Sequence, residues 1–228
     1  MRHLLILGET GAGKSTLTKE MVPLFGRVLV LDRHWEYLAS DGYEVIHGFA
    51  SLSQRLVSDL RGNWRIAFRT DTDAEWGAAV ALLYYAQREL SRNGEAREAL
   101  IVVEEIGLFS SPQKLPDWLG ALWNYGRHYD VYAVGICRQD TETHSVLRLN
   151  STMVFFRCTE VTAKVASALG RATIQRIAEL PLLTAPWKPQ AERNYVTYPD
   201  SGDVLERLKG RNRFDVTVSA PEKEIANG

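Results

Sequence analysis

Short runs of apolar residues alternate along the chain with segments in which apolar residues recur every three or four positions. Continuous apolar runs are typical of strands buried on both faces, whereas the longer spacing predicts amphipathic helices. Strands are predicted at residues 3–7, 27–32, 43–47, 64–69, 100–103, 131–137 and 153–158, with an edge strand at 194–198. Helices are predicted from Lys14 to Pro23 and at residues 51–60, 74–91, 117–128, 161–169 and 173–180. This alternation predicts an α/β/α fold with a mostly parallel central sheet.

The length of 228 residues suits one α/β domain, which we place at residues 1–208, followed by a partly mobile C-terminal extension at 209–228. The 27 basic and 28 acidic residues give a net charge of -1, so any nucleic-acid surface must be local. No apolar run approaches the length of a membrane span, and we expect at most indirect membrane contact. Cys137 and Cys158 lie in apolar runs, which fits a reducing, cytoplasmic compartment.

The strongest motif follows the first predicted strand, where residues 8–15 fit the phosphate-loop pattern G-x-x-x-x-G-K-[ST]. Glycines allow a tight backbone path in which successive N–H groups point at phosphate oxygens. Lys14 is expected to reach the β- and γ-phosphates and Ser15 to coordinate Mg²⁺, at the positive end of the following helix. The predicted ligands are therefore ATP and Mg²⁺. The predicted nucleotide-binding residues are Gly8, Glu9, Thr10, Gly11, Ala12, Gly13, Lys14, Ser15 and Thr16.

Two acids, Glu104 and Glu105, follow the apolar strand 100–103 as in a Walker B motif, although Asp is usual at the first position. One acid would hold Mg²⁺ through a water near Ser15, and the other would orient or deprotonate the attacking water. We assign these roles to Glu104 and Glu105 in that order, and the unusual first acid leaves the division open. Gln139 follows strand 131–137 and could contact the γ-phosphate or its water; the alternative is a surface glutamine in a loop.

Together with residues 125–128 and the segment from Asp32 to Tyr37, these motifs resemble the FtsK/HerA superfamily of P-loop motors. The segment Asp32-Arg-His-Trp-Glu36-Tyr37 is similar to the Asp-x-x-x-Glu-Tyr sequence after the second strand of HerA-like ATPases. The resemblance covers roughly residues 1–160, and the small size is most similar to genome-packaging ATPases of membrane-containing icosahedral viruses. It implies a RecA-like, ASCE-type P-loop fold.

The resemblance also implies a homo-oligomeric ring, with six subunits expected, that translocates double-stranded DNA by ATP hydrolysis. Capsid or portal proteins would be further partners, in the host cytoplasm or at a packaging vertex of the virion. In such rings an arginine from one subunit stabilises the γ-phosphate bound by its neighbour. Arg127 is the first candidate, although it could be an ordinary helix-end cation. The other candidates are Arg138, Arg148 and Arg157.

DNA contacts would fall to loops that face the channel, and the candidates are residues 109–114 and the tail arginines Arg211 and Arg213. Two other functions are compatible with the phosphate loop. A small-molecule kinase would need an arginine-rich lid, which is not evident, and would have reason to avoid a water-activating acid such as Glu105. An ATPase that drives secretion or virion extrusion is separated poorly from a DNA motor by the sequence.

Overall fold

The computed structural model describes residues 2–158, 161–180, 195–199 and 204–211. Its centre is an eight-stranded sheet in the order β3-β4-β2-β5-β6-β1-β7-β8. Neighbouring strands run parallel except for β8, which is antiparallel to β7 at the edge of the sheet. The strands are β1 (His3–Leu7), β2 (Arg27–Leu31), β3 (Glu44–His47), β4 (Trp64–Arg69), β5 (Ala99–Val103), β6 (Val131–Cys137), β7 (Ser151–Phe155) and β8 (Val196–Tyr198).

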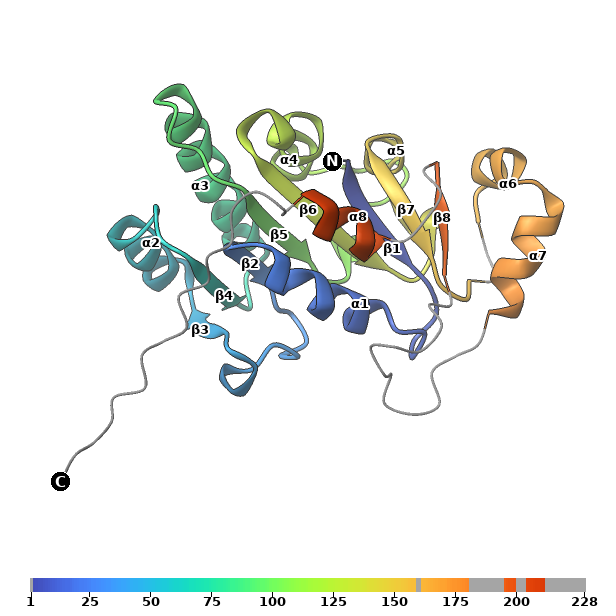
Figure 1. The fold of residues 1–228 in the computed structure, drawn as a ribbon, viewed down its shortest axis with the longest axis horizontal. Coiled ribbons are helices and arrows are strands. Elements are labelled where there is room, and N and C mark those ends of the chain that lie inside the picture. The colour runs from blue at the N-terminus through green and yellow to red at the C-terminus, as the bar shows by residue number, and fades with distance from the viewer. Residues whose placement is uncertain (1, 159–160, 181–194, 200–203, 212–228) are drawn as a thin grey trace.

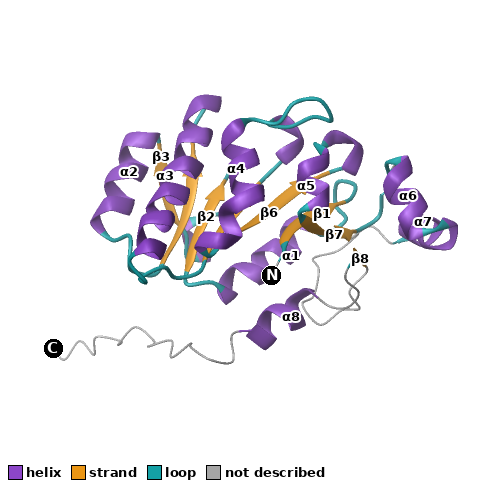
Figure 2. Cartoon of the chain, turned by 90° about the horizontal axis from the view of Figure 1, so that it is seen from above, coloured by secondary structure: helices purple, strands orange, loops and turns teal. Residues whose placement is uncertain are grey.

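Helices cover both faces of this sheet, as Figures 1 and 2 show. Helices α2 to α5 pack on one face, whereas α1 and α8 pack on the other (Figure 2). Helices α6 and α7 lie beyond the β8 end of the sheet (Figure 1). The helices are α1 (Lys14–Met21), α2 (Phe49–Ser58), α3 (Asp73–Arg92), α4 (Asp117–Tyr125), α5 (Ser145–Leu149), α6 (Ala163–Leu169), α7 (Arg171–Glu179) and α8 (Val204–Arg211). The predicted three-layer architecture is confirmed.

The core has two halves, one on each face of the sheet. In β1, Leu5 and Leu7 contribute to the half beneath α2 to α5, whereas Leu4 and Ile6 contribute to the half beneath α1 and α8. Successive side chains of a strand point to opposite faces, so a strand covered on both sides must be apolar throughout. This is why the central strands appear as unbroken apolar runs in the sequence.

Several element boundaries differ from the sequence prediction. The helix predicted to reach residue 128 ends at Tyr125 and continues as a 3₁₀ turn, η4 (Gly126–Tyr129), before Asp130 turns the chain into β6 with a left-handed φ of 56°. The strand predicted at 153–158 lies at Ser151–Phe155. Helix α5 was not predicted, because its 5 residues are too few for helical spacing to stand out, and α8 was not predicted either. Most of the predicted C-terminal extension, residues 212–228, lies outside the described residues.

None of the helices in the described ranges is long and apolar enough to cross a membrane.

Candidate nucleotide-binding site

The strand order brings the predicted motifs to one edge of the sheet. Strand β6 lies between β1 and β5, and all three are parallel. The phosphate loop follows β1, Gln139 follows β6, and the acids Glu104 and Glu105 follow β5. Because adjacent strands are about 4.8 Å apart, the backbone ends of β1 and β5 are separated by roughly 10 Å. A separation of this size at the carboxyl edge suits a polyphosphate held between the loop and the acids.

The phosphate loop has the backbone that its glycines predict. Gly8, Gly11 and Gly13 have φ values of 155°, 78° and 100°. A Cβ on Gly8 would lie 2.7 Å from Cβ of Phe156, so no side chain fits there. The N–H of Gly8 donates to the Arg138 carbonyl at 3.1 Å, which fixes the base of the loop on the end of β6. The loop path is therefore fixed by its glycines and by its hydrogen bond to the end of β6.

The start of α1 leaves its N–H groups available for an anion. Gly13 is the N-cap, no side chain caps the helix, and the first turn contains no acid. The first N–H groups of a helix lack internal partners, and phosphate oxygens are their natural acceptors. Ser15 and Thr16 are half-buried in this first turn, and the role of the Ser15 hydroxyl in magnesium coordination stays a prediction.

Lys14 already lies across the phosphate loop. Its Nζ donates to the carbonyl oxygens of Gly8 at 2.7 Å and Glu9 at 3.0 Å. Burial lowers the pKa of Lys14, while the nearby carboxylates of Glu105 and Glu104 act in the opposite direction. The ammonium thus lies between the loop and the two acids, where it can balance phosphate charge. The backbone of the phosphate loop, the uncapped start of α1 and the Lys14 ammonium together fit a nucleotide polyphosphate.

The two acids occupy different environments. Glu104 is buried, with 4% of its surface exposed, and its Oε1 accepts a hydrogen bond from the Tyr37 hydroxyl at 2.6 Å. Burial raises the pKa of Glu104 to about 7, and the hydrogen bond from Tyr37 partly counteracts this. A bound cation would favour the carboxylate form. Magnesium keeps several waters and commonly takes only one or two protein carboxylates, so Glu104 and Ser15 fit a magnesium site.

Glu105 has a left-handed backbone, with φ 50° and ψ 51°, at the start of the 3₁₀ turn Ile106–Leu108. Such a conformation is uncommon for a residue other than glycine and concentrates at functional sites. Its side chain is 31% exposed, and Oε1 lies 3.9 Å from Nε2 of His34. Glu105 therefore reaches water more readily than Glu104, which suits a residue that handles the attacking water.

Gln139 lies at the carboxyl end of β6, as predicted, and the strand order places it between the phosphate loop and the acids. The hydroxyl of Thr141 donates to its Oε1 at 3.1 Å. The next residue, Asp140, is buried and accepts two hydrogen bonds from Thr162, at 2.9 Å from N–H and 2.7 Å from the hydroxyl. This anchor to the start of α6 holds the loop after β6 in place beneath Gln139.

Arg127 is not brought to this site within the chain. It lies in η4, which precedes β6, whereas the phosphate loop follows the neighbouring strand β1. Since β6 has seven residues, about 20 Å separates Arg127 from the carboxyl edge. Nε of Arg127 is buried and has no hydrogen-bond partner in the described part of the chain. Arg127 could reach a phosphate loop only in another subunit, so its role in trans stays a prediction.

The alternative arginines lie elsewhere. Arg157 follows β7, and its Nε is 3.5 Å from Oε2 of Glu9 in the phosphate loop. Arg138 follows β6 directly at the carboxyl edge and is exposed. Arg148 in α5 donates to the carbonyl oxygen of Asp140 at 2.7 Å and to that of Thr143. Arg157 and Arg138 thus lie beside this chain's own phosphate loop, whereas Arg148 already stabilises a loop.

One group of site residues was not predicted as functional. Tyr37, Asp32 and Arg69 form a buried hydrogen-bonded network that ends on Glu104. Asp32 and Tyr37 belong to the segment that resembles HerA-like ATPases, and this resemblance could have marked them as functional. No sequence motif marks Arg69. It lies beside Asp32 because β4 pairs with β2 in the folded sheet.

The predicted DNA-contacting segments are only partly described. The loop at 109–114 follows β5, and Lys114 in it is exposed. Its turn is closed by a hydrogen bond from the Ser111 N–H to the Lys114 carbonyl at 2.9 Å. Arg213 lies outside the described residues, as does the side chain of Arg211. A DNA contact at either place stays a prediction.

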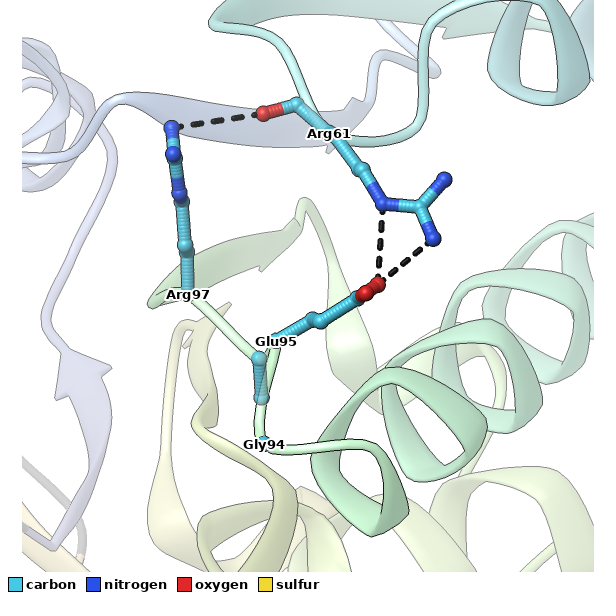
Figure 3. Close-up of a pocket in the computed structure, with 5 residues that line it drawn as sticks. Arg61, Gly94, Glu95 and Arg97 are labelled. Carbon is cyan, nitrogen blue, oxygen red and sulfur yellow. Dashed lines mark hydrogen bonds and ion pairs between the residues drawn. The ribbon is translucent and has the colours of Figure 1, made fainter.

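A pocket of about 330 Å³ lies at the amino ends of the strands, opposite the phosphate loop. Figure 3 shows its lining residues. It is lined by Arg61, Glu95, Arg97 and residues 94 and 96, in the loops before β4 and β5. Nε and Nη2 of Arg61 donate to one oxygen of Glu95 at 2.9 and 2.5 Å, and Arg97 donates to the Arg61 carbonyl at 3.5 Å (Figure 3). These internal bonds and the distance from the phosphate loop argue against a nucleotide site here.

The eight-stranded α/β/α fold with a phosphate loop after β1 and acids after β5 is a P-loop NTPase fold, which the chain shares with a genome-packaging NTPase. Residues 1–95 match the family model for the central domain of the helicase HerA. No curated protein sequence matches the chain.

Solved structures with this fold include genome-packaging NTPases. B204 of Sulfolobus turreted icosahedral virus 2, in complex with AMP, has a TM-score of 0.60 at 11% identity, over 86% of this chain and 92% of that one. Its complex with AMPPCP has a TM-score of 0.55 at 14% identity, over 79% and 88%. The DNA-packaging ATPase B204 of Sulfolobus turreted icosahedral virus has a TM-score of 0.54 at 12% identity, over 77% and 84%. The predicted resemblance to FtsK/HerA P-loop ATPases is confirmed.

Proposed function

We propose that this chain is an ATP-hydrolysing motor that translocates double-stranded DNA, acting as a ring in the packaging of a viral genome. The observation that carries the proposal is the placement of Lys14, Glu104 and Glu105 around one phosphate cradle. A water-activating acid beside the phosphates favours hydrolysis over transfer to a small-molecule acceptor. The HerA family match and the fold shared with packaging NTPases support DNA as the substrate that is moved.

The chain's own groups divide the work of hydrolysis. The phosphate-loop N–H groups and Lys14 bind the β- and γ-phosphates and balance their charge. Ser15 and Glu104 would hold Mg²⁺, which would supply electrostatic stabilisation of the phosphoryl group. Glu105 accepts the proton of the attacking water, and Gln139 orients that water or the γ-phosphate. The carboxylate of Glu105 must be ionised to act as this base.

Assembly would complete the site. A neighbouring subunit supplies Arg127, whose cationic head stabilises charge that develops on the transferred group. The 20 Å or so between Arg127 and its own phosphate loop supports a role in trans rather than within one chain. Dependence of hydrolysis on assembly would couple subunits around a ring of, we propose, six copies. Capsid or portal proteins are the proposed partners, in the host cytoplasm or at a packaging vertex.

The test is ATP hydrolysis by the purified chain with and without double-stranded DNA, at low and high salt. We expect stimulation by DNA that fades with salt, because contacts to the phosphate backbone weaken as counterions compete. Glu105→Gln is the control, since it should bind ATP yet not turn it over. Hydrolysis indifferent to DNA would favour a motor for secretion or virion extrusion. Turnover only with an added small-molecule acceptor would favour a kinase.

A further inference from the structure

The residue that contacts the buried acid Glu104 is Tyr37, which lies in the loop after β2. Tyr37 is fully buried, and its hydroxyl donates to Oε1 of Glu104 at 2.6 Å. The other oxygen, Oε2, accepts no hydrogen bond from the described part of the chain. A carboxylate held at one oxygen cannot rotate freely, and its second oxygen faces one direction.

Two buried charges fix the backbone of Tyr37. Its N–H donates to Oδ2 of Asp32 at 3.4 Å, and its carbonyl accepts from Nη2 of Arg69 at 2.9 Å. Asp32 and Arg69 also form an ion pair at 2.8 Å, with side-chain exposures of 0% and 9%. Because both charges are buried, loss of either contact would leave a buried charged group with an unsatisfied hydrogen bond, so the backbone of Tyr37 is held firmly.

The same loop is tied to the helix that begins at the phosphate loop. Nζ of Lys19, in α1, donates to the Glu36 carbonyl at 2.8 Å and lies 5.2 Å from the centre of the Tyr37 ring. Tyr37 also meets the Tyr43 ring edge-on, at 5.1 Å between the ring centroids. The residue whose hydroxyl donates to Glu104 is therefore held at its backbone by Asp32 and Arg69 and at its ring by Lys19 and Tyr43.

We propose that Tyr37 is a positioning residue that fixes Oε1 of Glu104 and so leaves Oε2 as the oxygen offered to magnesium or to a magnesium-bound water. This inference rests on the proposed function, because it takes Glu104 as the acid that holds the metal. Residues that orient a metal-binding side chain typically contribute 10- to 100-fold to metal affinity or activity. Tyr37 would belong to that group although it touches neither nucleotide nor metal.

The test compares Tyr37→Phe with Tyr43→Phe, since each removes one hydroxyl from the same aromatic pair. The first readout is binding of a fluorescent ATP analogue as MgCl₂ is titrated. We expect Tyr37→Phe to raise the magnesium concentration for half-maximal binding by about tenfold. Its affinity for the analogue in EDTA should match that of the parent. Tyr43→Phe should behave as the parent in both, and equal magnesium requirements for the two variants would overturn the proposal.

The second readout is steady-state hydrolysis, in which Tyr37→Phe should lower kcat by about 10- to 100-fold while KM for ATP changes little. A parent protein that binds magnesium-ATP without hydrolysing it would contradict the proposed function, yet the magnesium titration would still decide the role of Tyr37. Should Tyr37→Phe fail to fold, Arg69→Lys serves instead. Lysine keeps the charge beside Asp32 but lacks the planar fork with which Arg69 donates to Asp32 from Nε and to the Tyr37 carbonyl from Nη2, so the magnesium requirement should again rise. An unchanged requirement would overturn the proposal.

Discussion

Gly8 lies directly against Phe156, so that a Cβ on Gly8 would come within 2.7 Å of Cβ of Phe156 and 3.1 Å of the Arg157 carbonyl. Both contacts are on or beside the backbone that follows β7, where nothing can move aside cheaply. Phe156 is itself held by a hydrogen bond from its N–H to the Leu7 carbonyl at 2.8 Å. The path of the phosphate loop therefore depends on the absence of one methyl group.

Gly8→Ala should lower ATP affinity by at least about tenfold, because the loop must shift out of register with the phosphates. Equilibrium binding of a fluorescent ATP analogue measures this. Gly42→Ala is the matched control: Gly42 also has a left-handed φ, of 84°, but a Cβ there meets nothing within 4 Å. Gly42→Ala should cost some stability and leave affinity intact. Equal loss of affinity in both variants would show that backbone strain, and not the contact with Phe156, is responsible.

Arg127→Ala should reduce ATP hydrolysis by about 10³-fold without changing the nucleotide affinity of an isolated subunit. Affinity should not change, because Arg127 lies at the amino edge of the sheet, remote from the phosphate loop of its own chain. Hydrolysis should fall, because the neighbouring subunit loses the cation that Arg127 supplies. Mixing Arg127→Ala with Glu105→Gln subunits should restore part of the hydrolysis, since each supplies the group that the other lacks. Absence of rescue in a mixed assembly that forms normally would argue against action in trans.

His3 should make the protein less stable in mild acid. The side chain is fully buried, its Nδ1 accepts from the Ala133 N–H at 3.0 Å, and burial, with a contribution from Arg127, lowers its pKa to about 3. The unfolded chain therefore binds a proton below pH 6.5 that the folded chain does not. The stability from a neutral His3 is fully present above pH 6.5 and is lost as the pH falls toward 3, by about 1.4 kcal/mol per pH unit.

The comparison uses His3→Asn, which keeps a hydrogen-bond acceptor and does not titrate. Urea unfolding between pH 7.5 and 5 should show the parent losing stability relative to the variant as the pH falls. The difference between the two proteins is needed because Glu104, whose pKa is raised, acts in the opposite direction over an overlapping range. Parallel stability curves would contradict the assignment of a neutral, buried His3.

The sequence predicts most of the sheet because burial on both faces demands apolar runs, as in β5 and β6. Helix ends are predicted less well, since the change from α4 to a 3₁₀ turn at Gly126 depends on packing rather than on spacing. The phosphate loop and the acids of β5 are predicted by local motifs. The network behind Glu104 is not, because it joins Asp32 to Arg69 across 37 positions of sequence.

The central claim is that ATP hydrolysis at this site moves the protein along duplex DNA. The most direct measurement is displacement of a third strand bound to linear double-stranded DNA, followed over time with ATP and Mg²⁺. The account predicts displacement by the parent protein that requires ATP, fades at high salt and is absent in Glu105→Gln. Vigorous ATP hydrolysis in the presence of DNA, without displacement of the third strand, would contradict it.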